Sequence, residues 1–248
     1  ASSYAMRELG VPFAGLFGAC STMAEGLALG AALCEGGAAR NLLAMASSHF
    51  CAAERQFRTP LSYGAVRTPT AQWTATAAGC CLLQPQGEGV GIAAATFGRV
   101  QDYQVKDINN MGAAMAPAAA STLLRYFKDT GTEPQEFDCI YTGDLGQVGS
   151  QLLRELLAAE GLLIKNHVDC GCILFDANEQ SVKSGGSGPG CCAAVLCGHI
   201  LPRLRRGSQK RVLFTATGAL MSQTTFLQKE SIPAVAHLVE LRAPEKEK

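Results

Sequence analysis

The chain has 248 residues, 48% of them hydrophobic, and its 21 basic side chains balance 21 acidic ones. This length supports a large hydrophobic core, and the zero formal charge argues against nucleic acid as a partner. Most of the 11 cysteines lie in apolar runs, where cysteine behaves as a small hydrophobic residue. The composition therefore favours a globular chain in a reducing compartment over a secreted disulfide scaffold.

Residues 2–10 resemble the end of a helix, so we expect a further segment to precede this chain. A glycine-rich turn then leads into a helix that begins near Cys20 and stops at Gly36. The helical spacing of its apolar residues predicts one buried face, formed by Met23, Leu27, Ala31 and Cys34. Residues 41–47 are typical of a short buried strand. We therefore expect Cys20 at the start of a buried helix, where unpaired N–H groups and the helix dipole favour a thiolate or a bound anion.

The same order of elements occurs a second time. An ungapped overlay at an offset of 171 residues pairs Cys20 with Cys191 and Gly36 with Gly207. Each copy contains a glycine-rich turn, a helix that begins at a cysteine, a glycine stop and an apolar strand. We interpret this pattern as a diverged internal duplication, whose two helices pack as equivalents within one fold.

The rest of the chain alternates predicted strands with predicted helices. The strands are expected over residues 73–83, 90–100 and 138–142, and the helices over residues 113–128 and 147–160. Such alternation predicts a layered α/β fold.

Polar and basic residues follow the first predicted strand directly, at the place where α/β folds hold their ligands. These residues include Ser48, His49, Arg55 and Arg58. The structural alternative is a solvated loop in which His49 only caps a neighbouring element. The segment is thus a candidate binding site that the sequence alone does not separate from a surface loop.

Other polar residues precede predicted helices and have a structural alternative as well. Asn110 and Asp144 each stand where a side chain caps a helix. Residues 166–172 bring cysteine, histidine and aspartate close together, but the second ligand pair of a zinc site is missing. We therefore expect no metal there and interpret His167 as a polar loop residue.

A cysteine at a helix start, in one of two duplicated β-α-β halves, resembles the thiolase and ketoacyl-synthase fold. Longer strings along essentially the whole chain resemble the stage V sporulation protein AD family; they lie at residues 18–25, 47–51, 53–58, 69–74, 109–117, 142–146, 185–188 and 216–220. The resemblance implies a thiolase-like α-β-α-β-α fold. It also implies that the N-terminal part of that fold is missing here, so that residues 1–88 hold the remainder of the first half and residues 89–248 hold the second.

The same resemblance implies a binding protein without enzymatic activity. Family members bind dipicolinic acid, pyridine-2,6-dicarboxylate, for its uptake into the developing spore and its release in germination. Residues 143–146 stand where the condensing enzymes carry His-x-Ala-Asn, and residues 186–189 stand where they carry Gly-Asn-Thr-Ser. Because Asp144 replaces the histidine, we expect it to raise the pKa of a neighbouring thiol. No cofactor is expected, and calcium only as part of the ligand.

The resemblance and the residue chemistry together give a predicted ligand shell. Helix N–H groups, arginine side chains and glycine-rich backbone suit a flat dianion. The predicted ligand residues are Cys20, Ser48, His49, Arg55, Arg58, Gln72, Asn110, Asp144, Gly186, Ser187 and Gly188. One rival hypothesis is an acyltransferase with a Cys20–His49 pair, and another is a structural subunit that docks membrane partners.

The expected setting also follows from the resemblance. The implied partners are the other membrane proteins of the stage V sporulation A operon, at the inner membrane of the forming spore. No apolar run reaches the length of a membrane span and no signal-peptide pattern is found, so we expect peripheral attachment. A homodimer is expected by analogy with related folds.

Overall fold

The structure is a computed structural model that describes residues 2–57 and 67–245. The helical segments, with the 3₁₀ turns η1 and η3 and the π-helical turn η4, are α1 (Ser2–Leu9), η1 (Ala19–Ser21), α2 (Thr22–Glu35), α3 (Phe50–Phe57), α4 (Met111–Thr130), η3 (Pro134–Glu136), α5 (Gly146–Ala159), α6 (Cys170–Leu174), α7 (Pro189–Val195), η4 (Leu196–Ile200), α8 (Leu201–Arg205) and α9 (Gln223–Leu227). The strands are β1 (Leu42–Ser48), β2 (Trp73–Thr74), β3 (Ala77–Leu83), β4 (Gly91–Thr96), β5 (Cys139–Thr142), β6 (His167–Asp169), β7 (Gly186–Ser187), β8 (Arg211–Ala219) and β9 (Ala234–Arg242).

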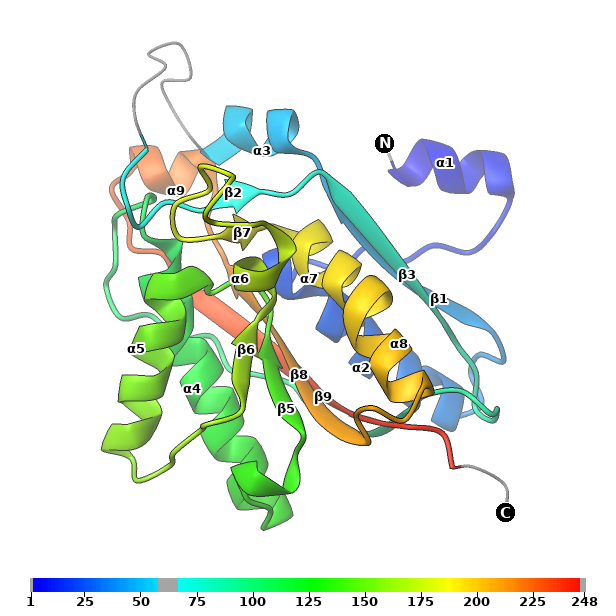
Figure 1. Cartoon of the computed structure of the whole chain (residues 1–248). Helices are drawn as coiled ribbons and strands as arrows, with labels where there is room; N and C mark the ends of the chain where they lie inside the picture. Colours follow the sequence, from blue (N-terminus) through cyan, green and yellow to red (C-terminus); the bar gives the residue numbers. More distant parts are fainter. Residues whose placement is uncertain (1, 58–66, 246–248) are drawn as a thin grey trace.

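The largest sheet has five strands in the order β4-β9-β8-β5-β6 (Figure 1). Strand β8 runs parallel to β5, which runs parallel to β6, whereas β9 is antiparallel to both β8 and β4. Two smaller pairings complete the described strands: β1 with β3, antiparallel, and β2 with β7, parallel. The mixed sheet with its α-helical connections is the layered α/β fold that the alternation predicted.

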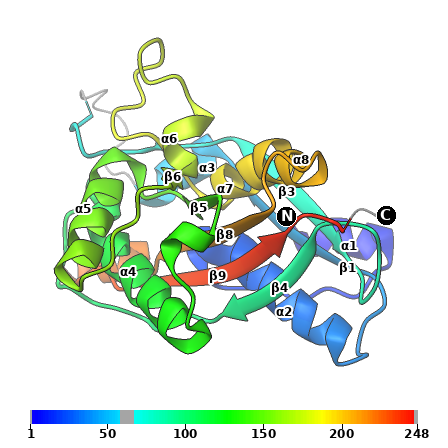
Figure 2. The ribbon, with the colours of Figure 1, turned by 60° about the horizontal axis from the view of Figure 1, so that its bottom comes forward.

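Helices cover both faces of the five-stranded sheet and separate it from β1 and β3 (Figures 1 and 2). On one face, the alanine-rich side of α4 and the leucines of α5 form a core with β5, β8 and β9. On the other face, α2 and α7 lie between the sheet and the β1–β3 pair, and a second core joins all of them. The described layers are thus helix, sheet, helix and sheet, in keeping with a thiolase-like arrangement.

Helix α4 shows how local sequence sets the ends of an element. The Asn110 side chain accepts a hydrogen bond from the Ala113 N–H, 3.3 Å away, at the N-terminus. Gly131 adopts φ 65° at the C-terminus, a left-handed conformation that suits glycine. Asn110 therefore serves as a helix cap, which is the structural alternative given for it above.

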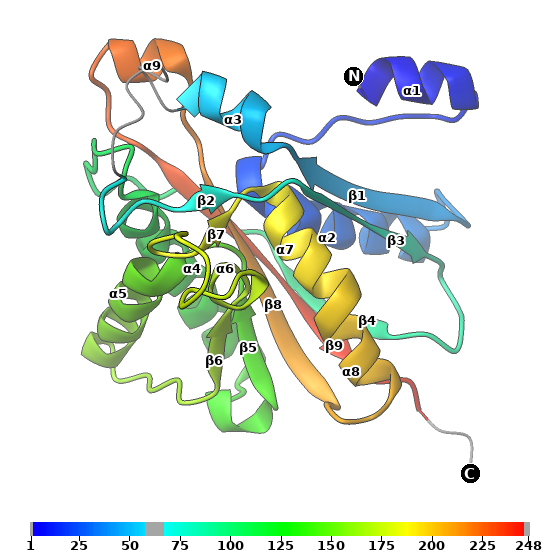
Figure 3. The same ribbon diagram turned by 45° about the horizontal axis from the view of Figure 1, so that its top comes forward.

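The duplication is visible in the structure, but its register differs from the ungapped overlay. In Figure 3, α2 lies beside α7, and β1 and β3 repeat the antiparallel pairing of β8 and β9. Positive φ angles mark both helix starts, at Ala19 and Gly188, and both helix ends, at Gly37 and Gly207.

The matching starts are 169 residues apart, and the matching ends are 170 residues apart. The extra residue coincides with the π-helical turn η4 of the second copy, since a π-turn accommodates one more residue than an α-turn. Cys20 thus corresponds to Pro189 rather than to Cys191, and the 171-residue overlay was wrong by one to two positions.

Most predicted elements are present, with shifted ends. The predicted strand over residues 73–83 is divided into β2 and β3, and the one over residues 90–100 is limited to β4. Of the predicted stripe on α2, the side chains of Met23, Leu27 and Cys34 are buried. Among the described helices, none has the length and apolar character needed to cross a membrane.

Candidate functional site

Cys20 lies in the tight turn η1, which leads into α2. Ala19 before it has φ 50°, an uncommon value for a residue with a side chain. Two hydroxyl groups hold this turn, because Ser21 Oγ donates to the Gly18 carbonyl and Thr22 Oγ1 to the Ala19 carbonyl, each at 2.6 Å. The predicted position of Cys20 at a buried helix start is therefore confirmed.

The two helix starts interlock with the strands of the opposite copy. A Cβ atom on Gly218, at the end of β8, would lie 2.2 Å from the Gly18 carbonyl oxygen, so only glycine lets the Cys20 turn approach. In the equivalent place, the Gly190 N–H donates to Ser48 Oγ at the end of β1, at 3.0 Å. The Cys192 thiol also lies 3.5 Å from the Cys20 carbonyl oxygen. The site thus lies where the η1 turn contacts the end of β8 and α7 contacts the end of β1. We call this region the junction.

Asp144 lies fully buried at this junction and joins three remote segments. Its Oδ2 accepts hydrogen bonds from Ser187 Oγ at 3.0 Å and from the Gly188 N–H at 2.9 Å. Its Oδ1 accepts from Thr217 Oγ1 at 2.9 Å. Burial raises the pKa of the Asp144 carboxyl in spite of these donors. Asp144 therefore does not cap α5, and its side chain ties β7 and β8 to the end of β5.

The electrostatics at Cys20 favour a protonated thiol. Burial raises the pKa of the Cys20 thiol well above its ordinary value, and the charge of Asp144 and its hydrogen bond to the thiol raise it further. The direction of the Asp144 effect agrees with the expectation from the sequence. Three neighbouring cysteines, Cys170, Cys191 and Cys192, also have pKa values raised mainly by burial. Burial and the nearby carboxylate thus disfavour a thiolate at this junction.

A second buried carboxylate, Asp169, was not among the predicted site residues. Its two oxygens accept from the Leu145 and Gly146 N–H groups, each at 2.9 Å, so it performs the capping role at α5. Burial first, and then the charge of Asp144, raise the pKa of Asp169 to about 6. The signal that could have found Asp169 is its position directly after a strand, at the same sheet edge as Asp144.

Several predicted ligand residues hold the main chain of the junction. The Gln72 side-chain N–H₂ donates to the carbonyl oxygens of Asp144 and, at 3.0 Å, of Gly186. Ser48 Oγ donates to the Ala75 carbonyl at 2.7 Å, besides accepting from Gly190. Ser187 belongs to the short strand β7, whose pairing with β2 positions residues 185–188 beside Asp144. These residues gather around one junction, as the sequence suggested.

Other predicted residues lie away from the junction or outside the description. His49 is exposed directly after β1. The acidic residue that is hydrogen-bonded to the Cys20 thiol is Asp144. Arg58 lies outside the described residues, and so does the side chain of Arg55, whose backbone belongs to α3. Within the described part of the chain, no three His, Cys, Asp or Glu side chains come together as metal ligands.

Aromatic and basic side chains meet beside the junction, close to the β2–β7 pair. The Phe50 and Trp73 rings stack with centroids 4.5 Å apart. The Arg67 guanidinium lies 4.3 Å from the centroid of the Trp73 ring. Because Trp73 pairs with Gly186 across the two strands, its fluorescence is well placed to report changes at the junction.

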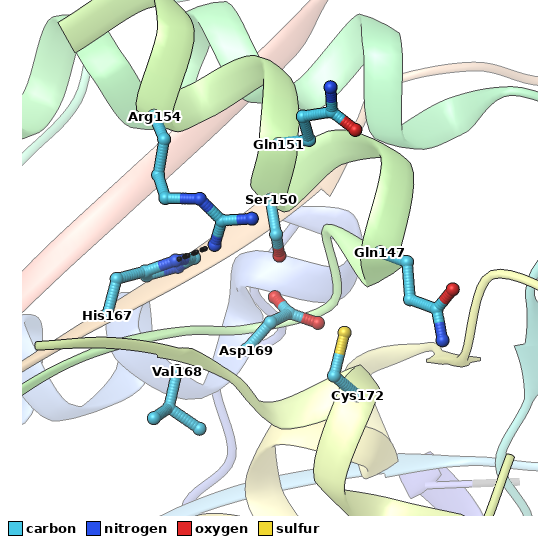
Figure 4. Close-up of a pocket in the computed structure, with 8 residues that line it drawn as sticks. All are labelled: Gln147, Ser150, Gln151, Arg154, His167, Val168, Asp169 and Cys172. Carbon is cyan, nitrogen blue, oxygen red and sulfur yellow. Dashed lines mark hydrogen bonds between the residues drawn. The ribbon is translucent and has the colours of Figure 1, made fainter. Parts of the chain in front are cut away.

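A cavity of about 430 Å³ lies on the other side of Asp169, between α5, β6 and α6 (Figure 4). Arg154 donates to His167 Nδ1 at 3.4 Å, and His167 Nε2 lies 2.8 Å from Thr142 Oγ1. Thr142 in turn donates to Asp169 Oδ2 at 2.7 Å. Burial, with a smaller effect of Arg154, lowers the pKa of His167 to about 4. The interpretation of His167 as a loop residue was wrong, since it lies in β6 and connects this cavity to a buried carboxylate.

Solved structures with a similar fold include a condensing enzyme and two acyl carrier protein synthases. The chain aligns with the tetronic acid condensing enzyme AbyA1 at a TM-score of 0.59 and 15% identity, over 97% of this chain and 72% of that one. It aligns with β-ketoacyl-[acyl carrier protein] synthase III from Thermus thermophilus at a TM-score of 0.59 and 14% identity, over 99% and 72% of the two chains. For 3-oxoacyl-(acyl carrier protein) synthase III from Pseudomonas aeruginosa the TM-score is 0.57 at 14% identity, over 98% and 72%. These likenesses show a thiolase-like fold.

Sequence comparison is more specific. A model of the family described as stage V sporulation protein AD (SpoVAD) matches residues 1–242. Stage V sporulation protein AD of Bacillus subtilis (strain 168) is 43% identical over 237 residues, which cover 95% of this chain and 70% of that protein. The chain therefore belongs to the stage V sporulation protein AD family of sporulation proteins, built on a thiolase-like fold.

Proposed function

We propose that this protein binds dipicolinic acid, alone or as its calcium chelate, at the junction of the two copies and does not catalyse acyl transfer. The observation that carries the proposal is the pairing of Cys20 with a buried carboxylate. A condensing cysteine needs a base that stabilises its thiolate, whereas Asp144 raises the pKa of the Cys20 thiol. The fold of an acyl-transfer enzyme is thus kept without the electrostatics of one.

The junction would hold a flat dicarboxylate through hydroxyl, amide and backbone donors. Ser48, Gln72 and Ser187 bring such groups together, and the ligand would replace the carbonyl and carboxylate acceptors to which they now donate. Gly188 gives close backbone access with φ 101°. Asp144 opposes a bare dianion by its charge. Its raised pKa reduces that opposition, and calcium, which prefers oxygen ligands, would turn it into an attraction. Arg55 and Arg58 are the proposed carboxylate-binding cations.

The biological role that we infer is movement of dipicolinate into the developing spore and its release in germination. In this role the protein would act at the inner membrane of the forming spore, as a peripheral homodimer beside membrane proteins of the same operon. Membership in a sporulation family supports this setting.

The test is a titration of dipicolinate by calorimetry, with and without calcium, while Trp73 fluorescence is followed in parallel. Isophthalate, which lacks the ring nitrogen, is the ligand control. We expect saturable binding that Cys20→Trp and Arg58→Ala abolish. Cys51→Trp is the matched control, because Cys51 is exposed, and it should bind as the unaltered chain does.

Two results would contradict the proposal. Absence of both heat and fluorescence change up to millimolar dipicolinate would leave a structural subunit as the better explanation. Transfer of an acyl group from a coenzyme A thioester to Cys20 would instead support the acyltransferase hypothesis. Labelling of Cys20 by a radioactive acyl thioester measures that second result directly.

A further inference from the structure

Two cysteines from opposite copies of the duplication face each other away from the Cys20 junction. Cys81 lies on β3 and Cys197 lies in the π-helical turn η4, and their sulfur atoms are 3.9 Å apart. Both residues are partly exposed, so a small reagent has access to them. We propose that Cys81 and Cys197 form a thiol–disulfide exchange site that joins the first-copy sheet to the second-copy helix.

The geometry requires little movement for the bond to form. A disulfide needs its sulfur atoms at about 2.05 Å, so side-chain rotation has to close less than about 2 Å from the present separation. The two elements are already held together nearby, since a Cβ atom on Gly79 would lie 2.5 Å from the Ala193 carbonyl oxygen. Close main-chain contact between β3 and α7, which leads directly into η4, thus holds the strand and the helix together beside the cysteine pair.

The surroundings make Cys197 the attacking thiol. Its sulfur has the Cys81 thiol as hydrogen-bond partner and lies 3.6 Å from the Cys80 carbonyl oxygen. The hydrogen bond with Cys81 lowers the pKa of Cys197, and the Arg205 charge adds to this, although burial opposes both. The same hydrogen bond raises the pKa of Cys81. Of the two sulfur atoms, Cys197 Sγ is therefore assigned as the one that attacks first.

The chemistry uses a small-molecule disulfide, such as oxidised glutathione, as the oxidant. The Cys197 thiolate attacks one sulfur of that disulfide, a mixed disulfide forms, and the first glutathione leaves as a thiolate that takes up a proton. Cys81 then loses its proton and attacks Cys197 Sγ, which releases the second glutathione. Overall, two protein thiols are oxidised and one small disulfide is reduced to two thiols.

The experiment is incubation of the folded chain with glutathione at graded ratios of oxidised to reduced form, followed by acid quenching, alkylation and peptide mass spectrometry. We expect an internal cross-link between the peptides of Cys81 and Cys197, with the loss of two hydrogen atoms. In Cys81→Ser we expect a trapped glutathione adduct on Cys197, and in Cys197→Ser neither a cross-link nor an adduct on Cys81. Cys51→Ser is the matched control and should leave the cross-link unchanged.

Other outcomes overturn the proposal. Adducts that accumulate on Cys51 or Cys80 while Cys81 and Cys197 stay reduced would show that the close thiols are only packed together. A cross-link from Cys197 to Cys80 would assign the exchange to a different pair. Circular dichroism of each variant before oxidation shows that it is folded, and the adduct on Cys197 in Cys81→Ser gives a test that does not depend on the Cys197 variant.

Discussion

The two copies of the duplicated unit have the same order of elements but different neighbours. Strand β8 of the second copy lies inside a five-stranded sheet and is buried along almost its whole length. Strand β1 of the first copy pairs only with β3 among the described strands, and its residues alternate between buried and exposed. At the 170-residue separation, Leu43 corresponds to Leu213; the first is 59% exposed and the second 0%.

A residue's role in the fold depends on what covers the opposite face of its strand. Both strands direct apolar residues toward the shared helical layer, where Ala44 and Ala46 meet the same core as Phe214 and Ala216. On the other face, Leu213 packs beneath α4 and α5, while Leu43 faces away from that shared layer. The same order of elements thus contains one strand that is buried on both faces, β8, and one that is buried on a single face, β1.

The largest expected effect comes from truncating these matched leucines. Leu213→Ala should lower the free energy of unfolding by about 2–5 kcal/mol, because it leaves a cavity in a closely packed core. Leu43→Ala should change it by less than about 0.5 kcal/mol in the same chain, since an exposed side chain loses little on removal. Urea unfolding followed by circular dichroism measures both values. Equal losses would show that the first-copy strand is covered in solution.

A somewhat smaller loss of stability is expected from substituting the residues that lie opposite these leucines on the neighbouring strands. Leu43 lies opposite the exposed Leu82, whereas Leu213 lies opposite Glu240, which is 2% exposed. Glu240 accepts hydrogen bonds from Arg211 Nε at 2.7 Å, from Arg242 Nε at 2.6 Å and from the Tyr126 hydroxyl. Burial alone would raise its pKa, but these donors outweigh it and lower the pKa of Glu240 to about 2.

The sign of this pKa shift gives a pH-dependent prediction. Because the folded state lowers the pKa from 4.5 to about 2, the stabilisation is complete above pH 4.5 and is lost as the pH falls toward 2. Glu240→Gln should lower the free energy of unfolding by roughly 1–3 kcal/mol at pH ~7, because buried donors lose their charged acceptor, and its difference from the unaltered chain should shrink at pH ~3. Leu82→Gln is the matched control and should be nearly neutral. A difference that stays constant with pH would contradict the ion-pair explanation.

Local periodicity allowed much of the fold to be predicted from the sequence. The buried stripe of α2, the glycine stop after it and the duplicated order of elements depend on residues close together in the chain. The register of the duplication could not be predicted, because the π-helical turn η4 adds one residue without any clear break in the helical pattern. The ungapped overlay therefore matched two cysteines that are not equivalent.

The candidate site was harder to predict because its hydrogen bonds cross between remote segments. Asp144 has the sequence context of a helix cap, and only the approach of Gly188 and Thr217 gives it another role. The capping role went to Asp169, from a different strand. The Cys, His and Asp cluster at residues 166–172 did not reveal the role of His167, since its partners Arg154 and Thr142 come from a helix and a neighbouring strand.

The smallest expected loss of stability tests the contact between the end of β1 in the first copy and α7 in the second copy. At the end of β1, Ser48 Oγ accepts from the Gly190 N–H and donates to the Ala75 carbonyl, whereas the equivalent position in β8 is Gly218. Ser48→Ala should cost about 1–2 kcal/mol, because it leaves both backbone groups without this partner. Ser47→Ala, at the exposed neighbouring position, should have almost no effect.

Hydrogen exchange locates the effect as well as measuring it. Loss of the Ser48 hydroxyl should speed exchange of the Gly190 amide and leave amides of α4 unchanged, because α4 belongs to the other core. If Ser48→Ala instead speeds exchange throughout both cores, the junction contributes to global stability rather than to the local seating of α7 on β1. That result would mean that the two cores unfold as one unit.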